Sequence, residues 1–217
     1  MDRRPAGIAG IVVAAGRGDR FGAAKQFLTL GGTTLVDHAV AHASAACDPV
    51  VVVVPAGSEW AGRPDVAVVT GGDTRSASVR AGLAAAPAEC EIVVVHDAAR
   101  PLAGVALFSA VIDAVRAGAD AAVPAIPVAD TLKRVDGERV VETVVRDALV
   151  AVQTPQAFRA DVLRAAHESG GDATDDAALV EAAGGRVVVV PGDRRNLKVT
   201  EPADLALAEA LLAGQLS

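Results

Sequence analysis

The feature that most constrains the fold of this chain is a series of short valine-rich runs separated by segments with a helical pattern. The run at 50–54 is five consecutive valines. A strand that is apolar on both faces needs cover on both, so such runs are typical of a sheet buried between helices. We expect strands at 8–14, 50–54, 66–70, 92–95, 120–125 and 187–190, and helices at 34–46, 75–86, 104–117, 159–168, 174–183 and 202–213.

This alternation predicts an α/β fold with a largely parallel sheet flanked by helices. Thr33 and Thr34 suit the start of the first helix, and Glu201-Pro202 the start of the last. The alternation stops at about 128–150, where two polar strand-like runs flank an Asp-Gly turn and predict a β-hairpin. A hairpin with little core of its own should pack on something. We interpret the hairpin as a projecting arm for dimerisation. The alternative is a simple excursion of the sheet. The rest of the chain fits a single domain, which with the arm spans 1–217.

Composition excludes several classes of function. The formal net charge is −7, so no net basic field would attract nucleic acid or an anionic membrane surface. No apolar run approaches the roughly 20 residues that span a bilayer. The apolar run at 8–15 is short for a signal-peptide core and leads into Gly16, which favours a first buried strand. Two cysteines without CxxC spacing fit a reduced environment, and we expect a cytoplasmic protein.

Lysine is rare here, because only three of the 20 basic residues are lysines: Lys25, Lys133 and Lys198. A compact ammonium differs chemically from a planar guanidinium, so a few retained lysines suggest specific roles. Lys25 closes a glycine-rich loop that follows the first predicted strand. The glycines at 16, 18 and 22 allow positive φ and close approach of phosphate oxygens to backbone N–H groups. The glycine spacing fits neither a dinucleotide fingerprint nor a P-loop. The loop therefore predicts phosphate binding but does not indicate which class of phosphate-binding protein this is.

Asp97 follows the predicted strand 92–95 within His-Asp-Ala-Ala-Arg-Pro. A carboxylate at a strand end could help to hold Mg²⁺ beside substrate phosphates, or could cap a following helix. We interpret His96 as structural, and His38 and His42 as solvated or packed histidines and not a zinc pair, since the HExxH glutamate is absent. The segment 71–78 could bind a base or ribose through its backbone and Ser78, or could form a turn with Thr74 or Asp73 as a helix N-cap.

Taken together, the loops resemble the 2-C-methyl-D-erythritol 4-phosphate cytidylyltransferase family over residues 8–212. The resemblance rests on seven motifs in order, each quoted from this sequence: A-A-G-x-G-x-R-F…K-Q-F at 14–27, G-G-D-x-R-x-x-S-V at 71–79, V-H-D-A-A-R-P at 95–101, D-T-L-K at 130–133, Q-T-P-Q-A-F at 153–158, T-D-D at 174–176 and N-L-K-V-T at 196–200. It implies a Rossmann-like nucleotidyltransferase fold, a homodimer joined through arms, and Mg²⁺-dependent transfer of CMP from CTP to a polyol phosphate.

The resemblance also implies site residues. Arg20, Lys25 and Lys198 would be catalytic, and Asp97 would take part in the metal site. The nucleotide would contact Ala14, Ala15, Gly16, Gly18, Gly72, Asp73 and Ser78. The acceptor would contact Arg100, Thr131, Arg146 and Thr154, with the arm residues supplied by the partner subunit. Lys133 lies on the arm without an assigned role.

Two departures from the family pattern stand out: Ala24 replaces a proline before the loop lysine, and Asp176 replaces a glutamate in T-D-D. Only a few residues follow the last predicted helix, so we expect no fused cyclodiphosphate synthase. Three alternatives remain. They are a cytidylyltransferase for another polyol phosphate such as ribitol 5-phosphate, a nucleotide-binding regulator without catalysis, and a nicotinamide dehydrogenase, which the glycine spacing disfavours.

Overall fold

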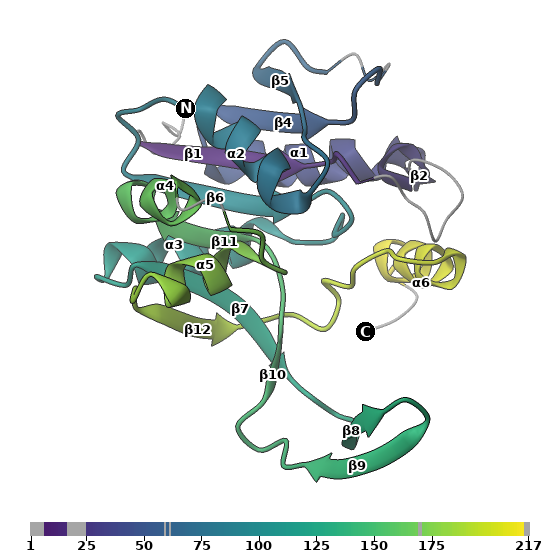
Figure 1. The fold of residues 1–217 in the computed structure, drawn as a ribbon. Coiled ribbons are helices and arrows are strands. Elements are labelled where there is room, and N and C mark those ends of the chain that lie inside the picture. Colours follow the sequence, from purple (N-terminus) through teal and green to yellow (C-terminus); the bar gives the residue numbers. More distant parts are fainter. Residues whose placement is uncertain (1–6, 17–24, 59, 61, 169–170, 215–217) are drawn as a thin grey trace.

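The computed structural model of the chain describes residues 7–16, 25–58, 60, 62–168 and 171–214. An eight-stranded sheet forms the centre of this part of the chain, in the order β10-β7-β11-β6-β1-β4-β5, with β12 also paired to β7 (Figure 1). Its strands are β1 (Ile8–Val13), β4 (Val50–Val54), β5 (Val66–Thr70), β6 (Ile92–Asp97), β7 (Ala121–Pro127), β10 (Val150–Val152), β11 (Gln156–Arg159) and β12 (Val187–Pro191).

The six predicted strands all form and run parallel to one another. β1 pairs parallel with β4 and β6, β4 with β5, and β12 with β7. The two short strands β10 and β11 were not predicted; β10 runs antiparallel to β7 and β11 antiparallel to β6. β11 lies between β6 and β7 and is antiparallel to both, which leaves β7 parallel to β6. The predicted α/β class with a largely parallel sheet is confirmed.

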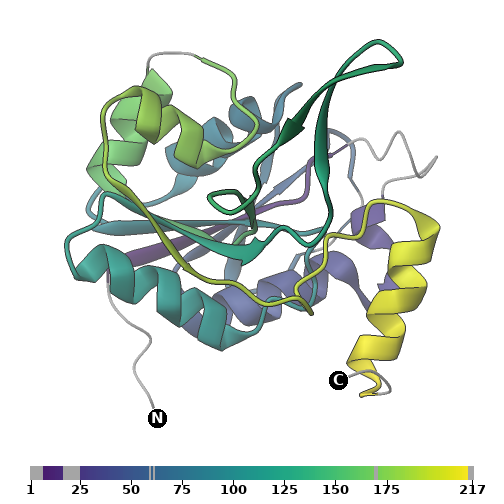
Figure 2. The same ribbon diagram turned by 90° about the horizontal axis from the view of Figure 1, so that it is seen from below.

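Helices cover both faces of the sheet, as Figure 2 shows in an edge-on view. α1 (Leu35–Ala46) and α3 (Val105–Arg116) lie on one face. α2 (Arg75–Ala85), α4 (Ala160–Glu168) and α5 (Asp176–Ala182) lie on the other. All the predicted helices are present within one or two residues at most ends.

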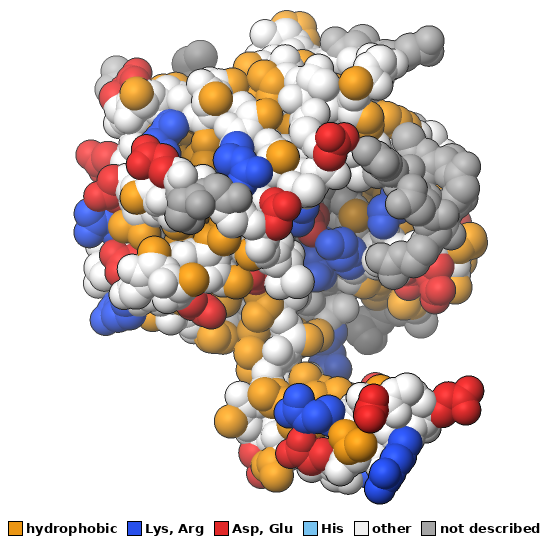
Figure 3. All heavy atoms as spheres, viewed as in Figure 1, with side chains coloured by type: hydrophobic (Ala, Val, Ile, Leu, Met, Phe, Trp, Pro, Cys, Tyr) orange, Lys and Arg blue, Asp and Glu red, His pale blue; other side chains and the backbone are white. Residues whose placement is uncertain are grey.

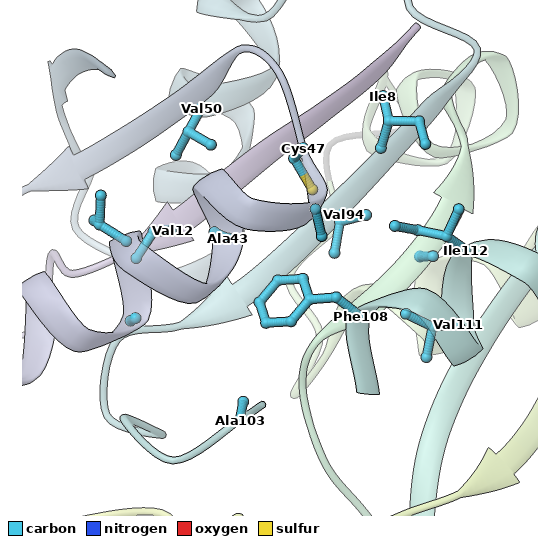
Figure 4. Close-up of a cluster of buried hydrophobic side chains, with 14 of the residues drawn as sticks. Ile8, Val12, Ala43, Cys47, Val50, Val94, Ala103, Phe108, Val111 and Ile112 are labelled. Atoms are coloured by element: carbon cyan, nitrogen blue, oxygen red, sulfur yellow. The ribbon is translucent and has the colours of Figure 1, made fainter. Parts of the chain in front are cut away.

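The doubly covered sheet produces two apolar cores, one on each face. On the α1–α3 side the ring of Phe108, which is fully buried, lies among side chains from β1, β6 and α1 (Figure 4). On the other side Gly82 brings α2 close to the sheet, because a Cβ there would meet Ile11 Cγ2 at 2.6 Å. Small residues therefore set the distance between helix and sheet.

The predicted hairpin is confirmed as β8 (Leu132–Asp136) and β9 (Arg139–Val144), with Gly137 in the turn at a φ of 56°. It forms a two-stranded sheet of its own and projects from the body as a separate arm (Figures 1 and 3). Its valines are exposed, with Val135 at 58% and Val140 at 54%. The arm thus presents apolar side chains that the single chain does not cover.

A small substructure stands beside the carboxyl edge of the sheet. It consists of η1 (Lys25–Phe27), the pair β2 (Thr29–Leu30) and β3 (Thr33–Thr34), and α6 (Pro202–Leu212). Leu30 and Leu35 pack with Val199 and Ala208 in a third core cluster. Thr34 begins α1 as its N-cap and Glu201-Pro202 begins α6, as predicted, and Glu201 forms a capping box with Asp204. Within the described residues, no helix is long and apolar enough to cross a membrane.

Candidate active site

The carboxyl ends of β1 and β6 border a cavity of about 260 Å³. After β1 the chain moves outward through β4 to β5 and then returns to β6 on the other side of β1. A crevice at such a reversal of strand order is where open α/β sheets bind ligands. Nine residues predicted for the site line this cavity: Ala14, Ala15, Gly16, Lys25, Gly72, Asp73, Ser78, Asp97 and Lys198.

The glycine-rich loop is described only at its two ends. Gly18 and Arg20 lie outside the described residues, so their predicted roles stay predictions. Gly16 does not adopt the positive φ that glycine allows, but a Cβ on Gly16 would meet nothing within 4 Å, so open space faces its backbone. Gln26 belongs to the first motif but had no predicted role. It is buried and donates from Nε2 to the Gly16 carbonyl at 3.2 Å. This bond joins the two described ends of the loop.

The segment 71–78 forms both a tight turn and the start of α2. The hydroxyl of Thr74 caps the helix by accepting from Ala77 N at 3.1 Å, which confirms the N-cap interpretation. A Cβ on Gly71 would lie 2.5 Å from Ala15 Cβ, so glycine keeps this turn against the end of β1. Because Gly72, Asp73 and Ser78 also line the cavity, the two interpretations of the segment are compatible.

Asp97 lies between two cations at the end of β6. Its Oδ2 accepts from Lys198 Nζ at 2.7 Å, and its Oδ1 accepts from Arg75 Nε at 3.3 Å. Burial alone would raise the pKa of this carboxyl, but the charges of Arg75 and Lys198 hold the pKa well below its ordinary value. Asp97 is therefore ionised. It does not cap a helix, because α3 begins after Gly104. The capping interpretation is wrong.

Arg75 connects Asp97 to a second buried carboxylate. Its Nη1 donates to Asp176 Oδ2 at 2.7 Å. Burial would lower the pKa of Arg75, but Asp97 and Asp176 together raise it. Sequence reasoning assigned no role to Arg75, although the arginine stands within the G-G-D-x-R motif. Its partner Asp176 is distant in sequence, so no local pattern could have identified the pair.

A second cavity of about 190 Å³ adjoins this charged group. Arg75, Asp97 and Lys198 line both cavities. The second one is also lined by Arg100 and Thr154, both predicted for the acceptor, and by a set of other polar residues: Gln153, Gln156, Thr174 and Asp175. Lys and Arg side chains gather in a hollow of the body above the arm (Figure 3). Two adjoining cavities thus share one wall of two cations and one carboxylate.

His96 is structural, as predicted, and its hydrogen bonds define its tautomer. The Arg100 carbonyl can only accept, so His96 Nε2 carries a proton and donates to it at 3.2 Å. In the neutral ring Nδ1 is then an acceptor, and the Thr154 hydroxyl, 3.1 Å away, donates to it while accepting from Asp97 N at 3.0 Å. Burial lowers the pKa of His96 to about 4, which keeps the ring neutral. The imidazole therefore joins two residues of the second cavity, Thr154 and Arg100.

Lys198 reaches the site because a buried polar network fixes the segment before it. Asn196 is fully buried and donates to the Thr154 carbonyl at 2.9 Å. Gln153 donates to the Asp193 carbonyl and accepts from Asp193 N. Val199 N then bonds to the Ala99 carbonyl at 2.8 Å. Sequence reasoning read these stretches as loops, because hydrogen bonds between distant loops leave no periodic signal.

Lys25 lies near the first turn of α6. Burial would raise the pKa of Asp204 there, but hydrogen bonds from Thr200 and Glu201 and the charge of Lys25 lower it. Because Lys198 precedes the same helix, both predicted catalytic lysines are positioned around its start.

The remaining predicted residues lie on or beside the arm. Thr131 and Arg146 are exposed and line neither of the two cavities. Arg146 donates to the Ala129 carbonyl. Lys133 donates to Thr143 Oγ1 at 2.6 Å across the hairpin, so within the chain it links the two arm strands.

A metal ion at the site would find few protein ligands among the described residues. The described part of the chain contains no group of three or more His, Cys, Asp and Glu side chains arranged to hold an ion. His38 Nε2 contacts the Leu30 carbonyl at 2.8 Å and His42 is half-buried, which agrees with their interpretation as packed histidines. Asp97 is the predicted metal residue, and a single carboxylate suits an ion held mainly by substrate phosphates and water.

A glycine-lined cavity beside a cationic wall, at the carboxyl edge of a doubly covered parallel sheet, suits a phosphorylated nucleotide. This combination places the chain among the nucleotidyltransferases. A family model described as 2-C-methyl-D-erythritol 4-phosphate cytidylyltransferase matches residues 8–214. The chain belongs to this family.

Curated relatives and solved structures agree with that family. An enzyme of this name from Streptomyces coelicolor is 50% identical, covering 97% of this chain and 87% of the relative. One from Nocardia farcinica is 49% identical, covering 94% of each chain. The crystal structure of the enzyme of this name from Thermus thermophilus superposes with a TM-score of 0.82 at 39% identity, covering 94% of this chain and 98% of that one. The nucleotidyltransferase fold predicted from the motifs is thereby confirmed.

Proposed function

We propose that this chain transfers CMP from CTP to 2-C-methyl-D-erythritol 4-phosphate, with release of pyrophosphate, in isoprenoid precursor biosynthesis. The observation that carries the proposal is the shared wall of Arg75, Asp97 and Lys198 between two cavities. A reaction between two anions needs two adjoining sites with positive charge at their junction. The first cavity, beside the glycine-rich loop, would hold CTP, and the second would hold the acceptor phosphate.

The reaction needs no side-chain nucleophile. An oxygen of the acceptor phosphate, already anionic, attacks the α-phosphorus of CTP. The new P–O bond forms as the bond to the β-phosphate oxygen breaks, and pyrophosphate carries away the electron pair. The chain's task is to hold both anions in line and to stabilise the charge that develops on the α-phosphate. Lys25 lines the nucleotide cavity, and Lys198 lines both.

We propose Mg²⁺ as the cofactor, with Asp97 as its protein ligand. The low pKa of Asp97 keeps the carboxylate ionised, and each of its oxygens has lone-pair capacity beyond its bond to Arg75 or Lys198. Its position on the shared wall is open to the nucleotide cavity. When bound, the ion would neutralise phosphate charge. Arg75 and Lys198 would keep Asp97 directed toward the phosphates.

We propose a homodimer joined through the arms. Val135 and Val140 are opposite each other in the hairpin, and both are more than half exposed. Side chains at directly paired positions share a face, so these two form the start of an apolar surface. The predicted acceptor residues Thr131 and Arg146 belong to the same arm and line neither cavity of their own chain. A partner's arm would bring them to the second cavity.

A cytoplasmic location remains our proposal from composition.

The experiment that tests the function supplies CTP and Mg²⁺ with 2-C-methyl-D-erythritol 4-phosphate or ribitol 5-phosphate in parallel and measures pyrophosphate release. We expect rapid release with the first acceptor and little with the second. Preference for ribitol 5-phosphate would transfer the proposal to that acceptor. No release with any acceptor, despite CTP binding, would support a regulator and contradict the proposed enzyme.

A further inference from the structure

A buried acid–imidazole pair lies behind the wall that the two cavities share. Asp176 begins α5 and is fully buried, and His167, near the end of α4, is 4% exposed. His167 Nε2 lies 3.0 Å from Asp176 Oδ1. Neither residue lines either cavity, and the proposed reaction does not use them directly.

The pair is connected to the site through Arg75. Asp176 Oδ2 accepts from Arg75 Nη1 at 2.7 Å, and Arg75 Nε donates to Asp97 Oδ1 at 3.3 Å. The four side chains form a continuous chain of hydrogen bonds from α4 to the end of β6, in the order His167, Asp176, Arg75 and Asp97. We propose that His167 and Asp176 are positioning residues, which fix the Arg75 guanidinium so that it holds Asp97 toward the reacting phosphates. This inference rests on the proposed function.

Asp176 is suited to this role because each of its oxygens has a different partner. A carboxylate held only by Arg75 could rotate about its terminal torsion, since that torsion has broad minima. The bond from His167 to the other oxygen removes this freedom. Arg75 is then held by two carboxylates on two elements, Asp97 on β6 and Asp176 on α5. A planar guanidinium transmits this orientation, because its donors form a rigid fork.

His167 acts through a single hydrogen bond. To donate to Asp176, Nε2 must carry a proton. Nδ1 is buried and has no hydrogen-bond partner within the described residues. A buried polar atom without a partner destabilises the fold, so an apolar side chain of similar size would serve packing better. The contribution of the imidazole is therefore the one bond that it donates.

The test compares two substitutions that differ in where they place a donor. The amide nitrogen of His167→Gln falls near the former Nε2, whereas that of His167→Asn falls near the former Nδ1. Steady-state pyrophosphate release would be measured at saturating acceptor with CTP varied. We expect His167→Asn to lower kcat roughly 10-fold, as loss of a supporting hydrogen bond does around other sites, with the KM for CTP within about twofold. His167→Gln should keep most of the wild-type kcat.

A double-mutant cycle with Asp176→Asn separates positioning from stability. Because His167 acts through Asp176, adding His167→Asn to Asp176→Asn should lower kcat no further. Multiplicative losses in the double variant would overturn the proposal. A pair that only stabilises the fold predicts lower melting temperatures with unchanged kcat per folded enzyme, and that outcome would overturn it too. An inactive wild-type enzyme would instead contradict the proposed function itself.

Discussion

Asp97 and Lys198 are 101 positions apart in sequence, yet Lys198 Nζ lies 2.7 Å from Asp97 Oδ2. The contact joins the end of the central strand β6 to the segment that leads into α6. It also lies where the two cavities meet. This junction combines one carboxylate with two cations, so replacing any one of the three changes the field at both cavities.

We expect Asp97→Asn to lower turnover by about 10²–10³, comparable to the loss of a transition-state contact in other enzymes. The amide keeps the volume but removes the carboxylate that Arg75 and Lys198 share, and it offers Mg²⁺ a weaker ligand. Pyrophosphate release measured over a range of Mg²⁺ concentrations checks this. Asp113→Asn is a matched control, because Asp113 is exposed on α3, where it pairs with Arg116. Near-normal turnover in Asp97→Asn would remove Asp97 from the site.

The three lysines give a second test with an internal control. Lys25 lines the nucleotide cavity, whereas Lys133 bonds to Thr143 on the exposed arm. We expect Lys25→Ala to fold normally and lose about 10²–10³ in kcat, because a cation beside the developing charge is lost. Lys133→Ala should keep its turnover within about twofold, as is usual for a surface substitution. Equal effects of the two substitutions would refute the separation of their roles.

The sequence predicted the covered parallel sheet because each buried strand leaves a local signal, as the five valines of β4 do. It also placed Lys25, Asp97 and Lys198 in the site, through motifs that the loops carry. It missed β11, whose four residues are too few to show a period, and the roles of Arg75 and Gln153. Those roles depend on partners far along the chain, such as Asp176 and Asp193, which only the folded structure brings into contact.

The arm gives a prediction about assembly. We expect Val140→Asp to shift the enzyme from dimer to monomer, because it places a charge within the apolar surface of Val135 and Val140. Sedimentation measures the mass of the assembly. If Thr131 and Arg146 contribute to the partner's second cavity, turnover should fall when the dimer dissociates. Glu142→Gln is the matched control, since it changes an already polar position of the same strand, paired with Arg134. A monomeric wild-type enzyme with full activity would contradict the proposed dimer.

His96 makes the stability of the fold dependent on pH. Burial lowers its pKa to about 4 from an ordinary value of 6.5. Between these two values the unfolded chain binds a proton at this site and the folded chain does not, so the free energy of unfolding falls as the pH falls. The slope from this residue is about 1.4 kcal/mol per pH unit in that window. His96→Asn keeps an acceptor for the Thr154 hydroxyl but cannot titrate. We therefore expect urea unfolding from about pH 4.5 to 6.5, a range set by the two pKa values, to give a shallower dependence of the free energy of unfolding on pH for the variant than for the wild type. Equal slopes would mean that the folded chain protonates His96 as readily as the unfolded one.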